Sequence, residues 1–311
     1  MESIISVRKL TKSYKNVKAV KAIDFEVEKG EIFGFLGPNG AGKSTTINMI
    51  CTMLKPTSGD IVINGYDATE EKDAVRASIG IIFQENTLDE KLTANENLLL
   101  HCRFYHVPKE QREKRIHEVL EIVDLVDERY RRVETFSGGM KRRLEIARGL
   151  LHYPKVLFLD EPTVGLDPQT RAHLWEYILK LKEKEGITMF LTTHYLDEAE
   201  ISDRVAIMDQ GEIIAIDSPT ALKDQLGGDM IELKTEDNEQ TLKEIEEKIE
   251  EAEVTVDGDT IHLKVASSDA FISTFMQNFT IPITTLNIRK PSLNDVFLAF
   301  TGRKIAEAAK E

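Results

Sequence analysis

The stretch Gly37-Pro38-Asn39-Gly40-Ala41-Gly42-Lys43-Ser44 decides the fold, and Thr45 follows directly behind it. It matches the phosphate-binding pattern G-x-x-x-x-G-K-[ST] at every fixed position, between the apolar run 32–36 and a helix-like segment from Lys43 to Met53. The glycines let backbone N–H groups turn inward as an anion nest, and the helix start adds its positive dipole end. We expect Lys43 to bridge the β- and γ-phosphates and the Ser44 hydroxyl to ligate Mg²⁺. The loop therefore predicts binding of a nucleoside triphosphate.

The composition describes an ordinary globular protein. The chain has 311 residues, of which 41% are hydrophobic and 30% charged, and this length favours two domains or one domain with an appendage. The net charge of -14 argues against nucleic acid as the main partner. No apolar stretch has the length of a membrane span, so any membrane role must come through a separate partner. Cys51 and Cys102 show no metal or redox spacing, which indicates a reducing compartment.

A second apolar run, Val156 to Leu159, ends in the adjacent carboxylates Asp160 and Glu161. An aspartate at the end of a buried strand is the usual partner of a phosphate loop and holds Mg²⁺. Glu161 would weaken phosphate binding by repulsion unless it does chemistry, and polarising the attacking water is that chemistry. We therefore expect Asp160 to hold the metal and Glu161 to act as the general base.

Two further β-branched or apolar runs also end in polar residues. Gln84 follows residues 79–83, and His194 follows residues 188–193. Because ligands of open α/β sheets gather at the carboxyl ends of the strands, both side chains are expected at the same edge as Asp160. This position predicts that His194 is catalytic. It would also let Gln84 contact the metal or the attacking water, but on its own Gln84 is better explained as a polar residue that ends a strand.

A second glycine-containing helix start follows a helical insertion that runs from Asn95 to Val126. Ser137 is a good N-cap, and Gly138 and Gly139 expose backbone N–H groups at the start of the next helix. One chain then has two helix N-termini that can bind an anion. Either it binds two nucleotides, or the second terminus completes the site of another subunit.

The character of the chain changes beyond Gly227-Gly228. Alternating strands, an acidic helix, a hairpin at 254–265 and a helix with Phe271, Phe275 and Phe279 indicate a small α+β domain without a catalytic constellation. Ser292 and Asp295 form an N-cap pair for a last short helix. We expect one domain at 1–225, with a helical subdomain at about 88–153, and a second at 226–311.

This set of motifs resembles the ATP-binding cassette (ABC) ATPases over roughly residues 4–220. The resemblance implies an α/β P-loop NTPase fold with a mixed sheet and a helical subdomain, and an ATP hydrolase that uses ATP and Mg²⁺. It assigns base stacking to Tyr14, phosphate binding to Gly37–Thr45, metal and water sensing to Gln84, and a γ-phosphate switch to His194. Asp160 and Glu161 keep the roles expected above.

The same resemblance implies a dimer. Ser137, Gly138, Gly139 and Met140 would form a signature that closes over ATP held by a second subunit, together with Asp167 in the turn after Gly165. A head-to-tail homodimer would then bury two ATP molecules. Such ATPases work on the inner face of the cell membrane, in the cytoplasm, through a separate membrane permease.

Phe136 and Met140 stand where the family usually has leucine and glutamine. With the tail segment 291–302, this variant is similar to the drug-resistance branch typified by daunorubicin export ATPases. The resemblance therefore implies an ATPase that powers export of the multidrug or antibiotic type.

Three other functions would explain all or part of these motifs. An ABC importer ATPase would share every motif, and a soluble ABC ATPase acting on ribosomes or DNA would need no permease. A P-loop kinase or GTPase would explain Gly37–Ser44 and Asp160 but would leave Ser137-Gly138-Gly139 and His194 without a role.

Overall fold

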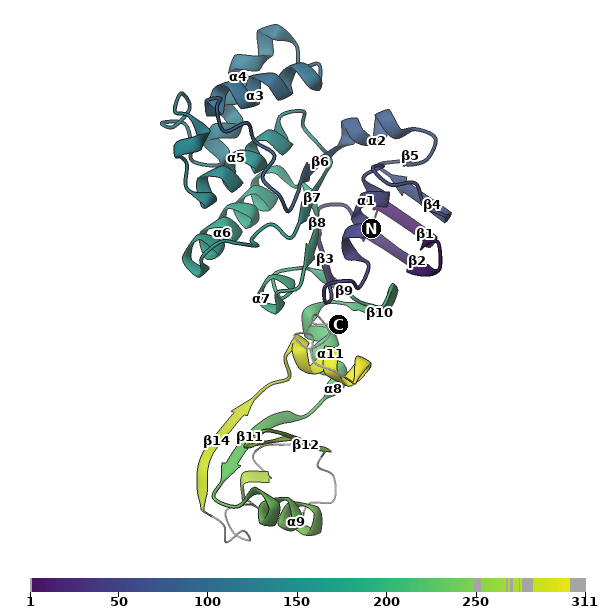
Figure 1. Ribbon diagram of the computed structural model, residues 1–311, viewed down its shortest axis with the longest axis vertical. Helices are drawn as coiled ribbons and strands as arrows, with labels where there is room; N and C mark the ends of the chain where they lie inside the picture. Colours follow the sequence, from purple (N-terminus) through teal and green to yellow (C-terminus); the bar gives the residue numbers. More distant parts are fainter. Residues whose placement is uncertain are drawn as a thin grey trace. The chain divides into compact units, whose positions relative to one another are not determined.

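The computed structural model describes residues 2–248, 253–266, 268, 271–273, 275 and 282–302. These residues form two compact units, the first ending at Ser218 and the second beginning at Pro219 (Figure 1). The sequence analysis places the domain boundary at residue 225. Helix α8 (Pro219–Leu226) groups with the second unit because it packs against α11 (Leu293–Thr301).

A six-stranded mixed sheet forms the centre of the first unit. Its strand order is β10-β9-β3-β8-β7-β6, and all neighbours are parallel except the β9–β10 hairpin. Both faces are covered, so the central strands are continuous apolar runs: Leu157 packs into one core and Phe158 into the other. The strands are β3 (Ile32–Leu36), β6 (Ile79–Ile82), β7 (Val156–Asp160), β8 (Thr188–Thr193), β9 (Arg204–Asp209) and β10 (Glu212–Asp217).

An antiparallel sheet with the order β2-β1-β4-β5 lies beside α1 (Lys43–Ile50) on one flank of this unit (Figure 1). Its strands are β1 (Ser3–Tyr14), β2 (Val17–Glu28), β4 (Ser58–Ile63) and β5 (Tyr66–Asp67). β4 begins at Ser58, so Gly59 lies within a strand. Gly59 has a φ of +95°, and a Cβ there would lie 2.4 Å from the Lys9 carbonyl oxygen, so the glycine admits close contact with β1.

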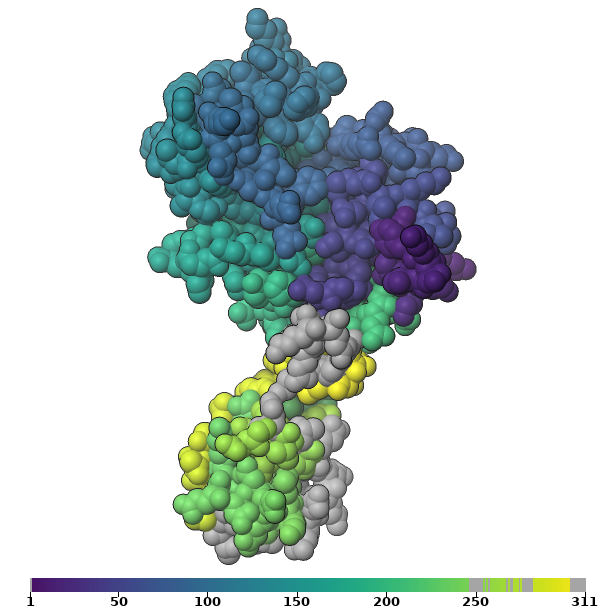
Figure 2. Space-filling view, viewed as in Figure 1, coloured from purple at the N-terminus to yellow at the C-terminus, as the bar shows by residue number. Residues whose placement is uncertain are grey.

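Helices cover the other face of the mixed sheet, and the insertion between β6 and β7 is helical as expected (Figure 1). Figure 2 shows this insertion, in blue to teal, at the surface of the first unit. Helix α5 lies directly on β6, since a Cβ on Gly80 would meet the Gly149 carbonyl oxygen at 2.3 Å. The helical elements of this unit besides α1 are α2 (Lys72–Ser78), α3 (Ala94–Phe104), α4 (Lys109–Ile122), η1 (Val133–Thr135), α5 (Gly138–Leu150), α6 (Pro168–Glu185) and α7 (Leu196–Ala199).

The second unit contains an antiparallel sheet with the order β12-β13-β11-β14. Ile231 and Leu263 pack in its core with Phe271 and Phe275, whereas Phe279 lies outside the described residues. The elements are β11 (Asp229–Thr235), α9 (Asn238–Lys248), β12 (Glu253–Asp257), β13 (Thr260–Val265) and β14 (Ile283–Arg289), besides α8 and α11.

The last helix, α11, begins with the capping box expected from Ser292 and Asp295. In the part of the chain that the structure describes, no helix combines the length and the apolar character of a membrane span.

Candidate functional site

The phosphate loop connects β3 to α1 and passes close to neighbouring backbone. A Cβ on Gly37 would lie 2.2 Å from the Met208 carbonyl oxygen. Gly42, the N-cap of α1, has a φ of +108°, and a Cβ there would lie 2.6 Å from the Ala19 carbonyl oxygen. These two positions therefore require glycine. The loop opens onto a cavity of about 330 Å³ lined by Ala19, Asn39, Gly40, Gly42, Lys43, Ser44, Thr45, Gln84 and Glu161.

Lys43 is buried and closes back over its own loop. Its Nζ donates to the carbonyl oxygens of Gly37 at 2.7 Å and Pro38 at 3.0 Å. The same atom lies 3.6 Å from Glu161 Oε1. Burial lowers the pKa of Lys43, and the Glu161 carboxylate partly offsets that effect. Glu161, the expected general base, thus forms an ion pair with this buried ammonium, and the charge of Asp160 adds a smaller attraction.

Glu161 occupies an unfavourable backbone conformation directly after β7. Its φ is +45°, in the left-handed region, which costs about 1–3 kcal/mol for a residue with a Cβ. The Glu161 N–H donates to both the carbonyl oxygen and the Oγ1 of Thr192, each at 3.1 Å. His194 Nδ1 lies 3.4 Å from Glu161 Oε1, and this contact, followed by the charge of Lys43, lowers the pKa of Glu161. A carboxylate on a strained backbone, held beside a cation and an imidazole, is typical of a catalytic site.

Asp160 ends β7 with its carboxylate largely buried. Its Oδ1 accepts a hydrogen bond of 2.5 Å from Thr192 Oγ1, and burial raises the pKa of Asp160. The side chains expected to hold Mg²⁺ are the Asp160 carboxylate, the Ser44 hydroxyl and the Gln84 amide. All three offer oxygen, the donor that Mg²⁺ prefers, and substrate phosphates normally complete such a set. No group of three or more His, Cys, Asp or Glu side chains with metal-site spacing occurs among the described residues, so a dedicated protein cage is absent there.

Sequence reasoning missed the residues that hold the end of β8. Glu198, 1% exposed, accepts hydrogen bonds from Thr163 Oγ1 and, at 2.5 Å, from Thr193 Oγ1. Thr193 Oγ1 also accepts from the Tyr195 N–H at 2.9 Å. These bonds fix the backbone on both sides of His194. In the sequence, the signal for these contacts is the pair Thr192-Thr193 at the end of a mostly apolar strand.

The second glycine-containing helix start lies outside the phosphate-loop cavity. Ser137 caps α5, and its Oγ accepts from the Met140 N–H at 3.2 Å. Ser137, Gly139 and Met140 line a different cavity of about 360 Å³. Asp167 caps α6 through the Thr170 N–H at 3.0 Å and is exposed. Within one chain, the expected signature residues are therefore not part of the site around Lys43 and Glu161.

Tyr14 also lies outside the lining of the phosphate-loop cavity. It ends β1 with 47% of its surface exposed, and Lys12 Nζ lies 5.1 Å from its ring centroid. From the antiparallel sheet, Ala19 contributes to the cavity lining. The ring is therefore partly exposed to solvent, and its role in base stacking stays a prediction.

Comparison with known proteins matches two family models. The model of ABC transporters matches residues 20–164, and that of the C-terminal domain of DrrA1-3-like ATP-binding proteins matches residues 218–301. The linearmycin resistance ATP-binding protein LnrL of Bacillus subtilis (strain 168) is 39% identical over 98% of this chain and 100% of its own length. The daunorubicin resistance ATP-binding protein DrrA3 of Streptomyces coeruleorubidus is 38% identical over 99% of each chain.

Solved structures show the same fold. CbiO1 from Clostridium perfringens, part of the ABC transporter complex cbiONQ, aligns with a TM-score of 0.68 and 26% identity over 80% of this chain and 96% of its own. The ATP-binding cassette MJ0796, solved as a dimer in a post-hydrolysis state with ADP and Pi, aligns with a TM-score of 0.62 and 30% identity over 69% of this chain and 98% of its own.

Proposed function

The chain belongs to the ABC transporter family of ATP-binding proteins, related to drug-resistance exporter ATPases, and we propose that Glu161 drives its ATP hydrolysis for export through a separate membrane permease. One observation carries the proposal: the strained Glu161 places its carboxylate within 3.6 Å of Lys43 Nζ and 3.4 Å of His194 Nδ1, at the edge of the phosphate-loop cavity.

In this proposal, Glu161 accepts the proton of the attacking water. Its lowered pKa keeps it ionised at neutral pH, as a base must be. Lys43 leaves the Gly37 and Pro38 carbonyls to meet the β- and γ-phosphates, and His194 stabilises the charge that develops on the γ-phosphate. Mg²⁺, held by Ser44, Gln84 and Asp160, would neutralise phosphate charge when bound.

We further propose that two copies pair head to tail. The helix start is exposed at Ser137 and Gly138 and half-buried at Gly139, and its cavity is separate from the phosphate loop, so it is available to ATP held by a second copy. Pairing of this kind buries two nucleotides, and loss of the γ-phosphate would reopen the dimer. Asp167, at the N-terminus of α6, would take part in the same contact.

The permease is proposed to dock in a groove of about 510 Å³ between α1–α2 and α3. Met53, Phe104 and Tyr105 line it, and each is 40% or more exposed. Exposed apolar side chains around a groove mark an interaction site, and Phe83 joins this lining directly before Gln84. The docked subunit would hold the ATPase at the cytoplasmic face of the membrane.

Replacing Glu161 by glutamine tests the base. Turnover should fall by about 10²- to 10⁴-fold while ATP binding is retained, because the amide keeps the shape but cannot take the proton. Steady-state phosphate release, nucleotide affinity and size-exclusion chromatography with ATP are the measurements, and ATP-dependent dimers should accumulate. Turnover at the parental rate would remove the base assignment.

A pull-down of membrane proteins with the tagged chain tests the partner and the direction of transport. Co-purification of a membrane subunit, and ATPase stimulation by a transported drug, are expected for an exporter. Stimulation by an extracellular substrate-binding protein would instead support an importer. A chain that purifies with ribosomes or DNA, and with no membrane subunit, would contradict both.

A further inference from the structure

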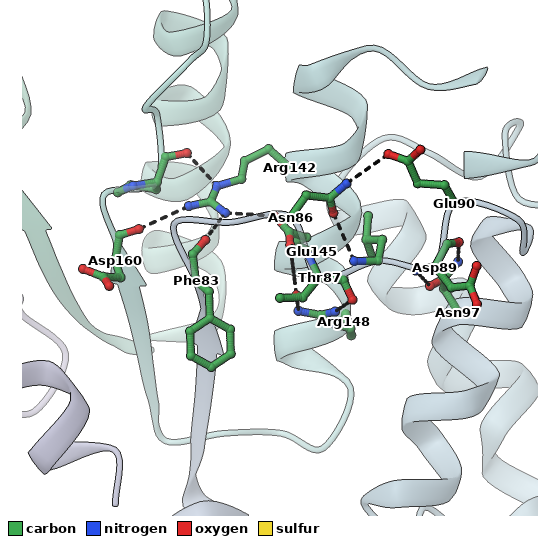
Figure 3. Close-up of polar contacts among 12 residues, drawn as sticks. Phe83, Asn86, Thr87, Asp89, Glu90, Asn97, Arg142, Glu145, Arg148 and Asp160 are labelled. Atoms are coloured by element: carbon green, nitrogen blue, oxygen red, sulfur yellow. Dashed lines mark hydrogen bonds and ion pairs between the residues drawn. The ribbon is translucent and has the colours of Figure 1, made fainter. Parts of the chain in front are cut away.

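Three charged side chains are buried along one face of α5. Arg142, Glu145 and Arg148 are spaced three residues apart, with exposed fractions of 6%, 2% and 6%. Buried charges are costly unless they are paired and fully hydrogen-bonded, so such a row requires specific partners. Figure 3 shows that these partners lie on the segments around Phe83, Thr87 and Asp160.

The Arg142 guanidinium contacts both catalytic segments at once. Its Nε donates to the Pro162 carbonyl oxygen at 2.6 Å, immediately after Glu161. Its Nη1 donates to the Phe83 carbonyl oxygen at 2.5 Å, immediately before Gln84. Its Nη2 lies 3.5 Å from the carbonyl oxygen of Asp160, and Glu145 Oε2 accepts from Nη1 at 2.8 Å. One planar side chain thus joins the backbone on both sides of Glu161 to the backbone beside Gln84.

Glu145 and Arg148 extend the same connection to Thr87. Glu145 Oε1 accepts from the Thr87 N–H at 2.9 Å and from its Oγ1 at 3.2 Å. Arg148 donates to the Thr87 carbonyl oxygen at 3.0 Å. The backbone before and after Gln84 is therefore bonded to α5, the helix that starts at Ser137.

We propose that Arg142 is a positioning residue for hydrolysis, which holds Glu161 and Gln84 in register with each other and with α5. The inference rests on the proposed role of Glu161 as the base. Glu161 needs external support because its left-handed backbone is unfavourable, and Arg142 bonds the peptide on each side of it. The fork of a guanidinium reaches three carbonyls in fixed directions, whereas a lysine ammonium presents a single point charge.

The test is Arg142→Lys, which keeps the charge and removes the fork. We expect kcat to fall about 10- to 100-fold, because a small displacement of a reacting group is costly in rate. KM and the affinity for a fluorescent ATP analogue should change less than about 2-fold, since Arg142 touches no residue of the phosphate loop. Glu145→Gln, a milder change to the same contact, should lower kcat by a smaller factor.

Arg115→Lys is the matched control. Arg115 is also buried, at 8% exposure, and its guanidinium donates to the carbonyl oxygens of Leu150 and Leu151 at the far end of α5. The substitution is chemically identical but leaves residues 83–87 and 160–162 untouched. It should lower the melting temperature about as much as Arg142→Lys while leaving kcat within about 2-fold. Equal losses of kcat in the two variants would overturn the proposal.

A double-mutant cycle separates positioning of the base from general damage. In a Glu161→Gln background there is no base to position, so Arg142→Lys can act only through Gln84 and should lower the residual kcat by a clearly smaller factor than in the parental background. An equal fold loss of kcat in the two backgrounds would overturn the positioning of the base and leave the base assignment intact. Parental turnover in Glu161→Gln alone would instead overturn the base assignment, and the positioning of that base with it.

Discussion

The phosphate loop and the start of α5 are both glycine-containing helix N-termini, but they are built differently. At α1 the N-cap is Gly42 in a left-handed conformation without a side-chain cap, and Lys43 closes the loop. At α5 the N-cap is Ser137, whose hydroxyl accepts from Met140 N–H. Glu161 and Gln84 line the cavity at the first terminus, whereas neither of them lines the cavity at the second.

The difference shows that an anion-ready helix terminus is only part of a phosphate site. The loop before α1 lies at the carboxyl edge of the parallel sheet, where β7 ends at Asp160 and His194 directly follows β8. The start of α5 offers its N–H groups in a different cavity, which Lys43, Glu161 and Gln84 do not line. We infer that one terminus holds the nucleotide and the other completes a site in a second copy.

Removing the lysine should produce the largest effect. Lys43→Ala takes away the buried cation that is expected to meet the β- and γ-phosphates, so hydrolysis should fall by about 10³-fold or more and ATP affinity should also fall. Phosphate release and titration with a fluorescent ATP analogue measure both. Lys29→Ala, which changes an exposed lysine, is the control and should retain parental values. Unchanged ATP affinity in Lys43→Ala would break the assignment of the first terminus.

Blocking the second terminus should lower the rate but not the binding of ATP. Ser137→Arg places a bulky cation at the start of α5, and kcat should fall about 10²-fold through loss of donors to the transferred phosphate. ATP affinity of the isolated chain should be retained, because the phosphate loop is untouched. A parallel loss of affinity would show that both termini serve one site.

Mixing the two inactive variants sharpens the same comparison. In a head-to-tail dimer of one Lys43→Ala copy and one Ser137→Arg copy, one nucleotide site contains both substitutions and the other contains neither. The mixture should therefore regain a measurable part of the parental ATPase activity. If activity stayed at the level of either variant alone at every ratio, the cross-subunit site would be excluded.

Mild acid should lower the stability of the protein through His101 on helix α3 before it protonates the catalytic carboxylate of Glu161. Burial, followed by the charges of Arg148 and His152, lowers the pKa of His101 from 6.5 to about 4. The folded state then binds fewer protons than the unfolded state between these pH values, so stability falls as the pH drops below 6.5. At pH 5 the loss is about 2 kcal/mol.

Urea unfolding of the parental chain and of His101→Gln at pH 7.5 and pH 5.0 measures this contribution. The variant should lose about 2 kcal/mol less than the parent on acidification. Glu161, whose pKa is lowered, stays ionised over the same range. Equal acid sensitivity of the two proteins would refute the role of His101.

The smallest effect concerns the cap of the second terminus. Ser137→Ala removes the hydrogen bond to Met140 N–H and should cost about 1 kcal/mol of stability, as for other N-cap serines. Thr93→Ala at the start of α3 removes a comparable cap and serves as the reference. A change in the urea midpoint only for Thr93→Ala would show that the Ser137 hydroxyl contributes nothing to the isolated chain.

Much of the site was predictable because it follows strand ends. The apolar runs before Gln84, Asp160 and His194 become neighbouring parallel strands, and parallel strands share one carboxyl edge. The order and type of the residues therefore predict that these side chains lie at one edge of the sheet. The N-caps at Ser137 and Ser292 were predictable for a similar reason, because they depend on residues three positions apart.

Local sequence patterns encode the chemistry of the site: a phosphate loop, two carboxylates, a histidine and two helix starts. The contacts that hold these groups in place depend on the fold. The Thr192 bond to Asp160, the two threonines on Glu198 and the reach of Arg142 to Phe83 and Pro162 join residues far apart in the chain. Most of the arginine's acceptors are backbone carbonyls, which every residue possesses, so no sequence pattern could single them out.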